Sequence, residues 1–273
     1  MQSKIRKMMK SIFIIFTLGV FSMNSHANDT SKNKRFPAED YFSGNRLEMG
    51  QAIYKNDKEQ VEKLLKQGID INALSDKEDG FTYLMYSVFL DNRFEIAELL
   101  LKYKADPNKV SRDLSKNKKR YVYYLPLTFA SERLPIKYME LLLRYGAKAN
   151  YGYIDENGRM PLNAMYPINA AVRSSYILWE WEREDFMNDI KARVDLLLKY
   201  GADINSRGSL GKSVVEFSLS NPEIILYLMD KGADHKIYGQ KILRGAKKLL
   251  KSNHNNMKLR EIIRRLEALG YKE

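Results

Sequence analysis

Side chains that could do acid–base, nucleophilic or metal chemistry are few in this sequence. Its histidines are His26, His235 and His254, and it contains no cysteine, so it has no Cys/His cluster of the kind that holds zinc. Four acidic residues lie between Glu180 and Asp185, and two neighbouring carboxylates can act as general acid and base. Glutamates that alternate along a helix usually form a solvated face, however. We therefore expect no enzyme, no catalytic residue, and no metal or cofactor.

A second chemical motif lies at residues 208–213. Their sequence, GSLGKS, is similar to the end of a phosphate-binding loop, in which glycines let backbone amides approach a phosphate. The leading glycine does not have the spacing of such a loop, and no strand pattern precedes it. We interpret this segment as a turn between two helices.

The feature that organises the chain is a phrase that returns five times. Each copy joins the apolar end of a helix to a small turn and then to Asp or Asn. The copies are LLKQGIDIN (64–72), LLLKYKADPN (99–108), LLLRYGAKAN (141–150), LLLKYGADIN (196–205) and LYLMDKGADHK (226–236). Self-similarity at such a period is typical of a solenoid, in which each unit buries its apolar face only by stacking on its neighbours.

Each phrase is preceded by a short apolar segment with a small residue at a fixed place. The segments are LEMGQAI (47–53), TYLMYSV (82–88), LPLTFAS (125–131), YPINAAV (166–172) and SVVEFSL (213–219), and the small residues are Ala52, Ser87, Ala130, Ala171 and Ser218. A small side chain lets two antiparallel helices approach closely. This column therefore predicts helix packing and not catalysis.

The two segments together resemble the ankyrin repeat, with its TPLHxA opening and its LLLxxGADxN close. The resemblance covers residues 45–236 and implies an all-α solenoid of about five helix-turn-helix repeats with hairpin fingers. The family's Pro column is kept by Pro126 and Pro167. Its His is replaced in all five repeats, by Gly50, Met85, Thr128, Asn169 and Glu216. We expect Thr128 and Asn169 to replace part of the hydrogen bonding of that His to the finger backbone.

The turn that closes each repeat has its own physical signature. Gly68, Gly146, Gly201 and Gly232 follow an apolar helix with Lys or Arg near its end, as expected for a left-handed residue beside the negative end of a helix dipole. Lys104 breaks this column, so we expect a strained or differently capped end in the second repeat. The Asp and Asn residues that follow are typical of Asx turns.

The N-terminal residues have the pattern of a secretory signal peptide. Four basic residues precede an apolar stretch at 12–21, and Ser25-His26-Ala27 ends it with small residues at the −3 and −1 positions. We expect cleavage after Ala27 and, since no cysteine offers a lipid attachment site, a location in the bacterial periplasm without membrane insertion. An uncleaved N-terminal anchor is the alternative.

We divide the chain into a signal peptide (1–27), a leader and N-cap entry (28–44), ankyrin repeats (45–236) and a C-terminal helical cap (237–273). In the cap, residues 240–251 and 257–269 both have helical spacing. Terminal repeats need a polar outer face for solubility. We expect this helix pair to be a cap and the free protein to be a monomer.

The charge of the chain bears on its partner. The formal net charge is +12, and four of the positive charges lie in residues 1–27, which leaves +8 for residues 28–273. Basic chains often bind nucleic acid, but export would separate this one from it. We expect no nucleic acid, and a protein partner with an acidic surface, because complementary charge speeds association.

Three departures from the plain repeat predict where a partner binds, because insertions in a solenoid become loops on one face. They are a long finger rich in Lys and Tyr (109–124), a second finger with an Asn-Gly hairpin signal (151–165), and an insertion in the fourth repeat. In that repeat 30 positions separate Ala171 from Gly201, against 16 between Ala130 and Gly146. The predicted contact residues are Lys118, Lys119, Arg120, Tyr121, Tyr123, Tyr124, Asn157, Arg159, Trp179, Trp181 and Phe186.

For function, the resemblance implies a module that binds protein. Exported ankyrin proteins of this kind resemble immunity proteins that neutralise a toxin acting in the periplasm, such as a phospholipase or hydrolase effector of a type VI secretion system. The alternative is a periplasmic scaffold that protects a resident enzyme such as a catalase. The sequence contains no motif specific to either.

Overall fold

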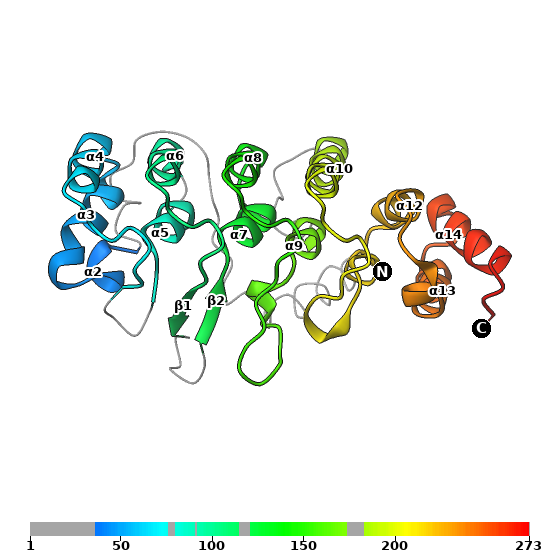
Figure 1. Ribbon diagram of the computed structural model, residues 1–273. Coiled ribbons are helices and arrows are strands. Elements are labelled where there is room, and N and C mark those ends of the chain that lie inside the picture. Colours follow the sequence, from blue (N-terminus) through cyan, green and yellow to red (C-terminus); the bar gives the residue numbers. More distant parts are fainter. Residues whose placement is uncertain (1–35, 76–79, 91, 115–120, 174–182, 273) are drawn as a thin grey trace, which may run out of the picture. The chain divides into compact units, whose positions relative to one another are not determined.

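The structure, a computed structural model, describes residues 36–75, 80–90, 92–114, 121–173 and 183–272 (Figure 1). The predicted signal peptide and most of the leader lie outside these residues. Residues 36–273 form one compact unit. Within the described residues, no helix combines the length and the apolar content needed to span a bilayer.

Successive helix pairs build this unit, and they form two rows (Figure 1). The finger row, from which the fingers project, consists of α3 (Leu47–Lys55), α5 (Tyr83–Phe89), α7 (Pro126–Arg133), α9 (Pro167–Arg173), α11 (Val214–Phe217) and α13 (His235–Ser252). The outer row consists of α4 (Lys58–Lys66), α6 (Phe94–Lys102), α8 (Ile136–Arg144), α10 (Arg183–Lys199), α12 (Pro222–Asp230) and α14 (Met257–Ala268). Each helix contacts its neighbour in the same row.

Short elements complete the architecture. The helix α2 (Ala38–Tyr41) and the 3-10 turn η2 (Gly44–Arg46) precede α3, and two further 3-10 turns, η3 (Leu162–Ala164) and η5 (Ser209–Gly211), lie in fingers. A two-stranded antiparallel sheet is formed by β1 (Ser111–Leu114) and β2 (Tyr121–Tyr124). The predicted all-α solenoid with hairpin fingers is confirmed.

The small-residue column packs as its composition predicts. Ser87, Ala130 and Ala171 are completely buried, and Ala52 and Ser218 are exposed by only 4% and 2%. Around them one continuous apolar cluster runs from Ala38 to Leu266. Each finger-row helix thus covers part of the next, which is the nearest-neighbour stacking that stabilises a repeat protein.

The repeat-closing turns also agree with the sequence. Gly68, Gly146, Gly201 and Gly232 have φ values between +83° and +91°. Lys104 adopts the same left-handed conformation with φ +74°, although for a residue with a Cβ that conformation costs about 1–2 kcal/mol. The predicted strain in the second repeat is confirmed.

An asparagine ladder joins the closing turns of consecutive repeats. Asn72 donates from Nδ2 to the carbonyl of Lys104 at 3.1 Å and accepts from the Asp106 amide at 2.7 Å. Asn108 repeats both bonds one unit on, to the Gly146 carbonyl at 3.0 Å and from the Lys148 amide at 2.8 Å. Asp70, Asp106, Asp203 and Asp234 form Asx turns with the amide two residues later. The Asp and Asn residues of the phrase are therefore turn formers.

The insertion in the fourth repeat lengthens an outer helix. The helix α10 has 17 residues, whereas α4, α6, α8 and α12 each have nine. The added residues lie before its end at Lys199, so part of the insertion extends this helix at its N-terminal side. Residues 174–182, which include both tryptophans, lie outside the described residues.

Two arginines of the outer row close the ends of finger-row helices. Arg93 donates from Nε to the Ile53 carbonyl at 2.9 Å and from Nη2 to the Tyr54 carbonyl at 2.6 Å. Arg193, only 3% exposed, donates to the Ala130 carbonyl at 3.2 Å and pairs with Asp189 at 2.5 Å. Both guanidinium groups satisfy carbonyls near a helix C-terminus, where a cation is electrostatically favoured.

The C-terminal pair packs as the predicted cap. The helix α13 contacts α11 and α14, and α14 also contacts α12. α13 begins at His235, two residues before the predicted boundary, because the Asp234 carboxylate accepts the Lys236 amide and caps its first turn. The end of the last repeat phrase is thus already part of the cap.

Candidate protein-binding surface

Three fingers project from the finger row, and we call their combined surface the finger face. It comprises residues 109–114 and 121–124, residues 151–166, and residues 206–213 (Figure 1). The described residues that we predicted to bind a partner in the first two departures belong to it: Tyr121, Tyr123, Tyr124, Asn157 and Arg159. Lys118, Lys119 and Arg120 lie outside the described residues.

The first finger is a regular hairpin anchored to the preceding repeat. Its strands pair with Ser111 opposite Tyr124 and Arg112 opposite Tyr123. The Ser111 hydroxyl accepts the Thr82 amide at 3.1 Å, and the Arg112 guanidinium lies 4.6 Å from the centre of the Tyr121 ring. Tyr121 is therefore held at a cation–π contact on a half-exposed strand.

The three tyrosines of this hairpin have different roles. Tyr123 stacks on Tyr153 of the second finger, with 4.6 Å between ring centres and 31° between ring planes. Burial and the neighbouring Tyr153 raise the pKa of Tyr123, so its hydroxyl stays protonated at neutral pH. This ring pair joins the first and second fingers side by side.

The Tyr124 ring packs among other aromatic rings beneath the hairpin. Its ring lies within 5.6–6.2 Å of the rings of Phe81, Phe89 and Phe129. Such aromatic clusters stabilise by area burial and by edge contacts. Tyr124 thus fixes the hairpin on the helices beneath, while Tyr121 and Tyr123 remain partly accessible.

The second finger ends in a turn organised by Asp155. Its carboxylate accepts the amides of Asn157 and Arg159, both at 2.9 Å, and the Gly158 amide donates to the Asp155 carbonyl at 2.9 Å. Only Gly158 in this turn has a positive φ, +69°. The expected two-residue Asn-Gly turn, which requires positive φ at both positions, is wrong; the loop is one residue longer. Asn157 and Arg159 are exposed at its tip.

The third finger holds the most unusual residue of the described chain. Leu210 has φ +62° and its side chain is 85% exposed. The turn around it is closed by bonds from the Gly208 amide to the Lys212 carbonyl at 2.9 Å and from the Gly211 amide to the Gly208 carbonyl at 3.0 Å. A leucine at this position has a strained backbone, and its exposed side chain gains no stabilisation from burial. The fold alone therefore does not explain it. Our sequence interpretation missed this residue, although a leucine between two glycines in a turn was the available signal.

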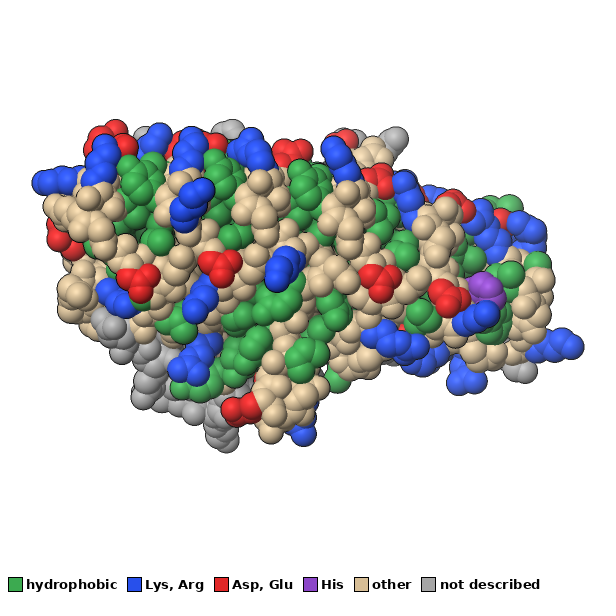
Figure 2. Space-filling view, in the orientation of Figure 1, with side chains coloured by type: hydrophobic (Ala, Val, Ile, Leu, Met, Phe, Trp, Pro, Cys, Tyr) green, Lys and Arg blue, Asp and Glu red, His purple; other side chains and the backbone are tan. Residues whose placement is uncertain are grey.

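Exposed apolar side chains recur on the neighbouring finger. Ile154 and Leu162 are 52% and 49% exposed. Basic residues flank the three apolar side chains: Arg112, Arg159, Arg207 and Lys212 are all exposed. Figure 2 shows hydrophobic side chains gathered over the fingers of the central repeats with Lys and Arg beside them. The finger face therefore combines apolar points of contact with a mainly positive surround.

Phe186, another predicted contact residue, is not part of this surface. Phe186 lies in α10, is 8% exposed and belongs to the continuous core, so it supports the lengthened helix and is not presented to a partner. Trp179 and Trp181 lie outside the described residues.

The positions that replace the family histidine behave differently from one another. The Thr128 hydroxyl donates to the Met165 carbonyl in the second finger at 2.9 Å, which confirms its expected role. The buried Asn169 amide makes no hydrogen bond to a described residue, so the same expectation is wrong there. The Glu216 carboxylate instead accepts the Ser213 amide at 2.8 Å in a capping box.

The described residues offer little for chemistry. Among them no cluster of three His, Cys, Asp or Glu could hold a metal ion. Nδ1 of His235 lies 3.1 Å from the Tyr271 hydroxyl in the cap, and residues 208–213 form the third finger with its turn η5. The arrangement fits a contact surface better than a reaction site.

Comparison with known proteins agrees with this architecture. A family model described as "Ankyrin repeats (3 copies)" matches residues 29–111. An ankyrin repeat protein of Acanthamoeba polyphaga mimivirus is 26% identical over 200 residues, which is 68% of this chain and 24% of that protein. The chain thus spans about a quarter of the length of this relative. Ankyrin repeats are a protein-interaction module, typically without catalytic activity. This chain therefore contains ankyrin repeats, and its described part folds as an all-α ankyrin solenoid.

Proposed function

We propose that the protein binds a partner protein through its finger face and, after export to the periplasm, neutralises a toxin that acts there. The observation that carries the binding proposal is Leu210, whose apolar side chain is 85% exposed on a left-handed backbone. Strain of this kind persists where the surroundings enforce it and is concentrated at functional sites. A partner that covers Leu210 would remove its apolar surface from water, which favours binding.

The chemistry of the finger face defines the partner. Its exposed apolar side chains suit a partner with apolar recesses, and Arg112, Arg159 and Arg207 suit an acidic rim around them. Stable interfaces bury about 800 Å² on each partner, an area that several fingers together provide and one does not. Rim charges mainly speed association, while the few buried anchors hold the complex together.

Neutralisation in the periplasm is the further step of the proposal. The signal-peptide pattern of residues 1–27 supports export, and a rigid array of fingers is well suited to covering the active site of an enzyme. We therefore favour an immunity protein against a periplasm-acting effector, such as a type VI secretion phospholipase or hydrolase. This step rests on analogy with exported ankyrin proteins.

The test is capture of the partner by residues 28–273, with a matched pair of variants. Leu210→Asp places a charge at the proposed anchor, whereas Leu269→Asp places the same charge at a 49% exposed leucine of the cap. We expect Leu210→Asp to weaken binding at least tenfold and Leu269→Asp to leave it unchanged. Equal binding by both variants would show that the interface does not include the third finger.

The identity of the captured protein tests the immunity proposal separately. A secreted hydrolase that kills cells when directed to the periplasm, and that is harmless when this protein is co-expressed, supports it. Recovery of a resident enzyme such as a catalase, without toxicity or protection, replaces it with the scaffold function.

A further inference from the structure

The positive charge of the chain is unevenly distributed. Residues 28–234 contain equal numbers of basic and acidic residues, 31 of each, whereas residues 235–272 contain eleven Lys and Arg and two Glu. The whole excess outside the predicted signal peptide thus lies in the helix pair α13–α14. Solubility of a terminal cap requires polar residues of either sign, and it does not require them all to be positive.

Ion pairs hold three of the four cations of α14, and the fourth, Arg260, donates to the His254 carbonyl, whereas one face of α13 carries cations without such partners in the described part of the chain. On α14, Lys258 pairs with Glu223, and Arg264 and Arg265 pair with Glu261. On α13, by contrast, Arg244, Lys248 and Lys251 are exposed and have no ion-pair partner among the described residues. We call these three residues the basic strip. Their i, i+4 and i+7 spacing places them on one side of the helix.

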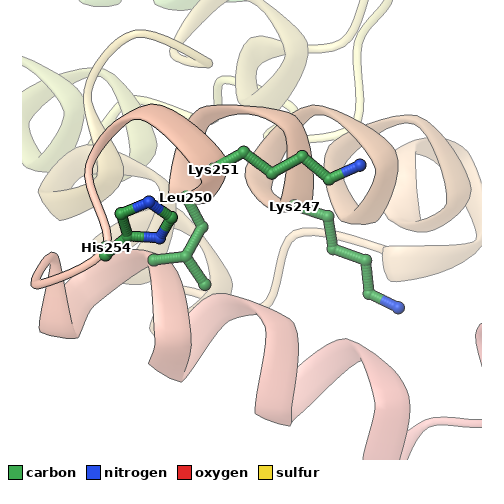
Figure 3. Close-up of a pocket in the computed structure, with 4 residues that line it drawn as sticks. All are labelled: Lys247, Leu250, Lys251 and His254. Carbon is green, nitrogen blue, oxygen red and sulfur yellow. The ribbon is translucent and has the colours of Figure 1, made fainter.

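Apolar groups lie next to the basic strip. A shallow pocket of about 260 Å³ between α13 and the turn before α14 is lined by Lys247, Leu250, Lys251 and His254. Figure 3 shows Leu250 beside the His254 ring, while the two lysine side chains carry their ammonium groups away from that ring. Met257, the first residue of α14, is 73% exposed. The local pattern is a row of cations beside a small apolar area.

We propose that the basic strip holds the protein reversibly on an anionic phospholipid bilayer. Each Lys or Arg near such a surface strengthens binding about fivefold, and Leu250 and Met257 offer a minor apolar contribution at the interface. No hydrogen bond to another described residue pre-orients a side chain of the strip. Such side chains suit laterally mobile headgroups better than a fixed partner. In the periplasm, the anionic outer face of the inner membrane would be within reach.

A nucleic acid fits this surface less well. Stacking of single-stranded bases needs exposed aromatic rings. In the described part of the cap, Tyr238 is 2% exposed and Tyr271 packs edge-on against His235. Binding of duplex DNA requires only cations on the protein, so it is one of the outcomes that the experiment distinguishes.

The experiment is co-sedimentation of residues 28–273 with vesicles. Residues 36–273 are a compact unit by themselves, and omission of residues 1–27 removes an apolar segment that would itself bind lipid. We expect binding to vesicles that contain phosphatidylglycerol, no binding to pure phosphatidylcholine, and loss of binding at high salt because ions screen the attraction.

Two charge-matched triple variants decide whether the strip is responsible. We expect Arg244→Gln, Lys248→Gln and Lys251→Gln together to weaken binding at least tenfold. The control combines Lys55→Gln, Lys58→Gln and Lys63→Gln, three exposed lysines of which the first lies in α3 and the other two in α4; we expect it to keep binding. Circular dichroism checks that both are folded. Leu210→Asp should still bind vesicles, so this test is independent of the finger face.

The opposite results would overturn the proposal. One such result is that the protein does not sediment with phosphatidylglycerol vesicles. The others are that both triple variants lose binding equally, or that the protein binds neutral vesicles as well as anionic ones. Tighter binding to a DNA duplex or to a poly-glutamate peptide than to the anionic vesicles, with the same dependence on the strip, would assign the strip to that polyanion.

Discussion

The finger face and the C-terminal helix pair are two surfaces of one solenoid that are built in opposite ways. On the finger face, turns and stacked rings hold exposed apolar side chains such as Leu210 in fixed positions. On α13, Tyr238, Ile242, Leu243 and Ala246 are buried, and the exposed side carries a row of cations. The first surface depends on contact at short range, the second on charge at longer range.

This difference shows how a repeat fold separates specificity from attraction. Contacts between fixed apolar side chains reward one complementary shape, whereas unpaired cations on a helix attract any anionic surface and weaken in salt. A protein with both can be concentrated at a surface by its cap and select its partner with its fingers. The predictions below test how far the central repeats and the cap differ.

The largest difference is expected between two arginines. Arg193 is buried, binds the Ala130 carbonyl and pairs with Asp189, so Arg193→Met should lower the free energy of unfolding by about 3 kcal/mol by leaving a partly buried carboxylate unpaired. Arg244→Met, on the basic strip, should change it by less than about 0.5 kcal/mol. Urea unfolding followed by circular dichroism measures both. Equal effects would refute the contrast.

The asparagine ladder gives the second comparison. Asn108 makes two hydrogen bonds to the next repeat, so Asn108→Ala should destabilise by about 1–2 kcal/mol. Asn255, exposed in the turn between α13 and α14, serves as the control, and Asn255→Ala should be neutral. The same unfolding experiment measures both; a neutral Asn108→Ala would show that the ladder does not couple the repeats.

Most of the framework was predictable from the sequence because it rests on local rules repeated five times. The left-handed turn at Lys104 and the Asx turns at Asp106 and Asp203 follow from the repeat phrase. The contacts of Arg93 and Arg193 with helix-end carbonyls could not be predicted from the repeat phrase, because they depend on which carbonyls the packing of the helices brings near each guanidinium. The environments of Phe186 and Asn169 were mispredicted for the same reason: burial is decided by neighbours far apart in sequence.

The finger face was predicted only in part. Sequence composition located the Lys- and Tyr-rich hairpin, but the division of roles among Tyr121, Tyr123 and Tyr124 arises from packing on Phe81 and Tyr153. Leu210 escaped notice because its strain is a property of the backbone, which composition does not display.

The junction between repeats and cap gives the third prediction. Glu223 of α12 pairs with Lys191 of α10 and Lys258 of α14, and hydrogen bonds from the two lysines lower its pKa from 4.5 to about 2. A depressed carboxyl pKa stabilises the fold above pH 4.5, and this stabilisation is lost as the pH falls toward 2.

Glu223→Gln should therefore lower the free energy of unfolding at pH 7 by about 1 kcal/mol or less, because solvent screens these partly exposed pairs. The deficit should shrink below pH 4.5. Thermal unfolding of both proteins across this range measures it; a deficit that does not depend on pH would mean that the ion pairs are not its cause.

The smallest effect concerns Leu210 itself. Leu210→Gly should raise the free energy of unfolding by about 0.5 kcal/mol, because relief of left-handed strain is partly offset by the greater freedom of glycine in the unfolded chain. Leu162→Gly, at the first position of η3, removes an exposed leucine without a positive φ and should destabilise. If Leu210→Gly destabilises the protein as well, left-handed strain at Leu210 does not lower its stability.

The most direct test of the finger face is photo-crosslinking in cells that produce the protein. A photoreactive amino acid would replace Leu210 in one variant and the exposed Lys63 of the outer row in another. We predict a discrete protein adduct from position 210 and none from position 63. Adducts from position 63 alone would contradict binding through the fingers.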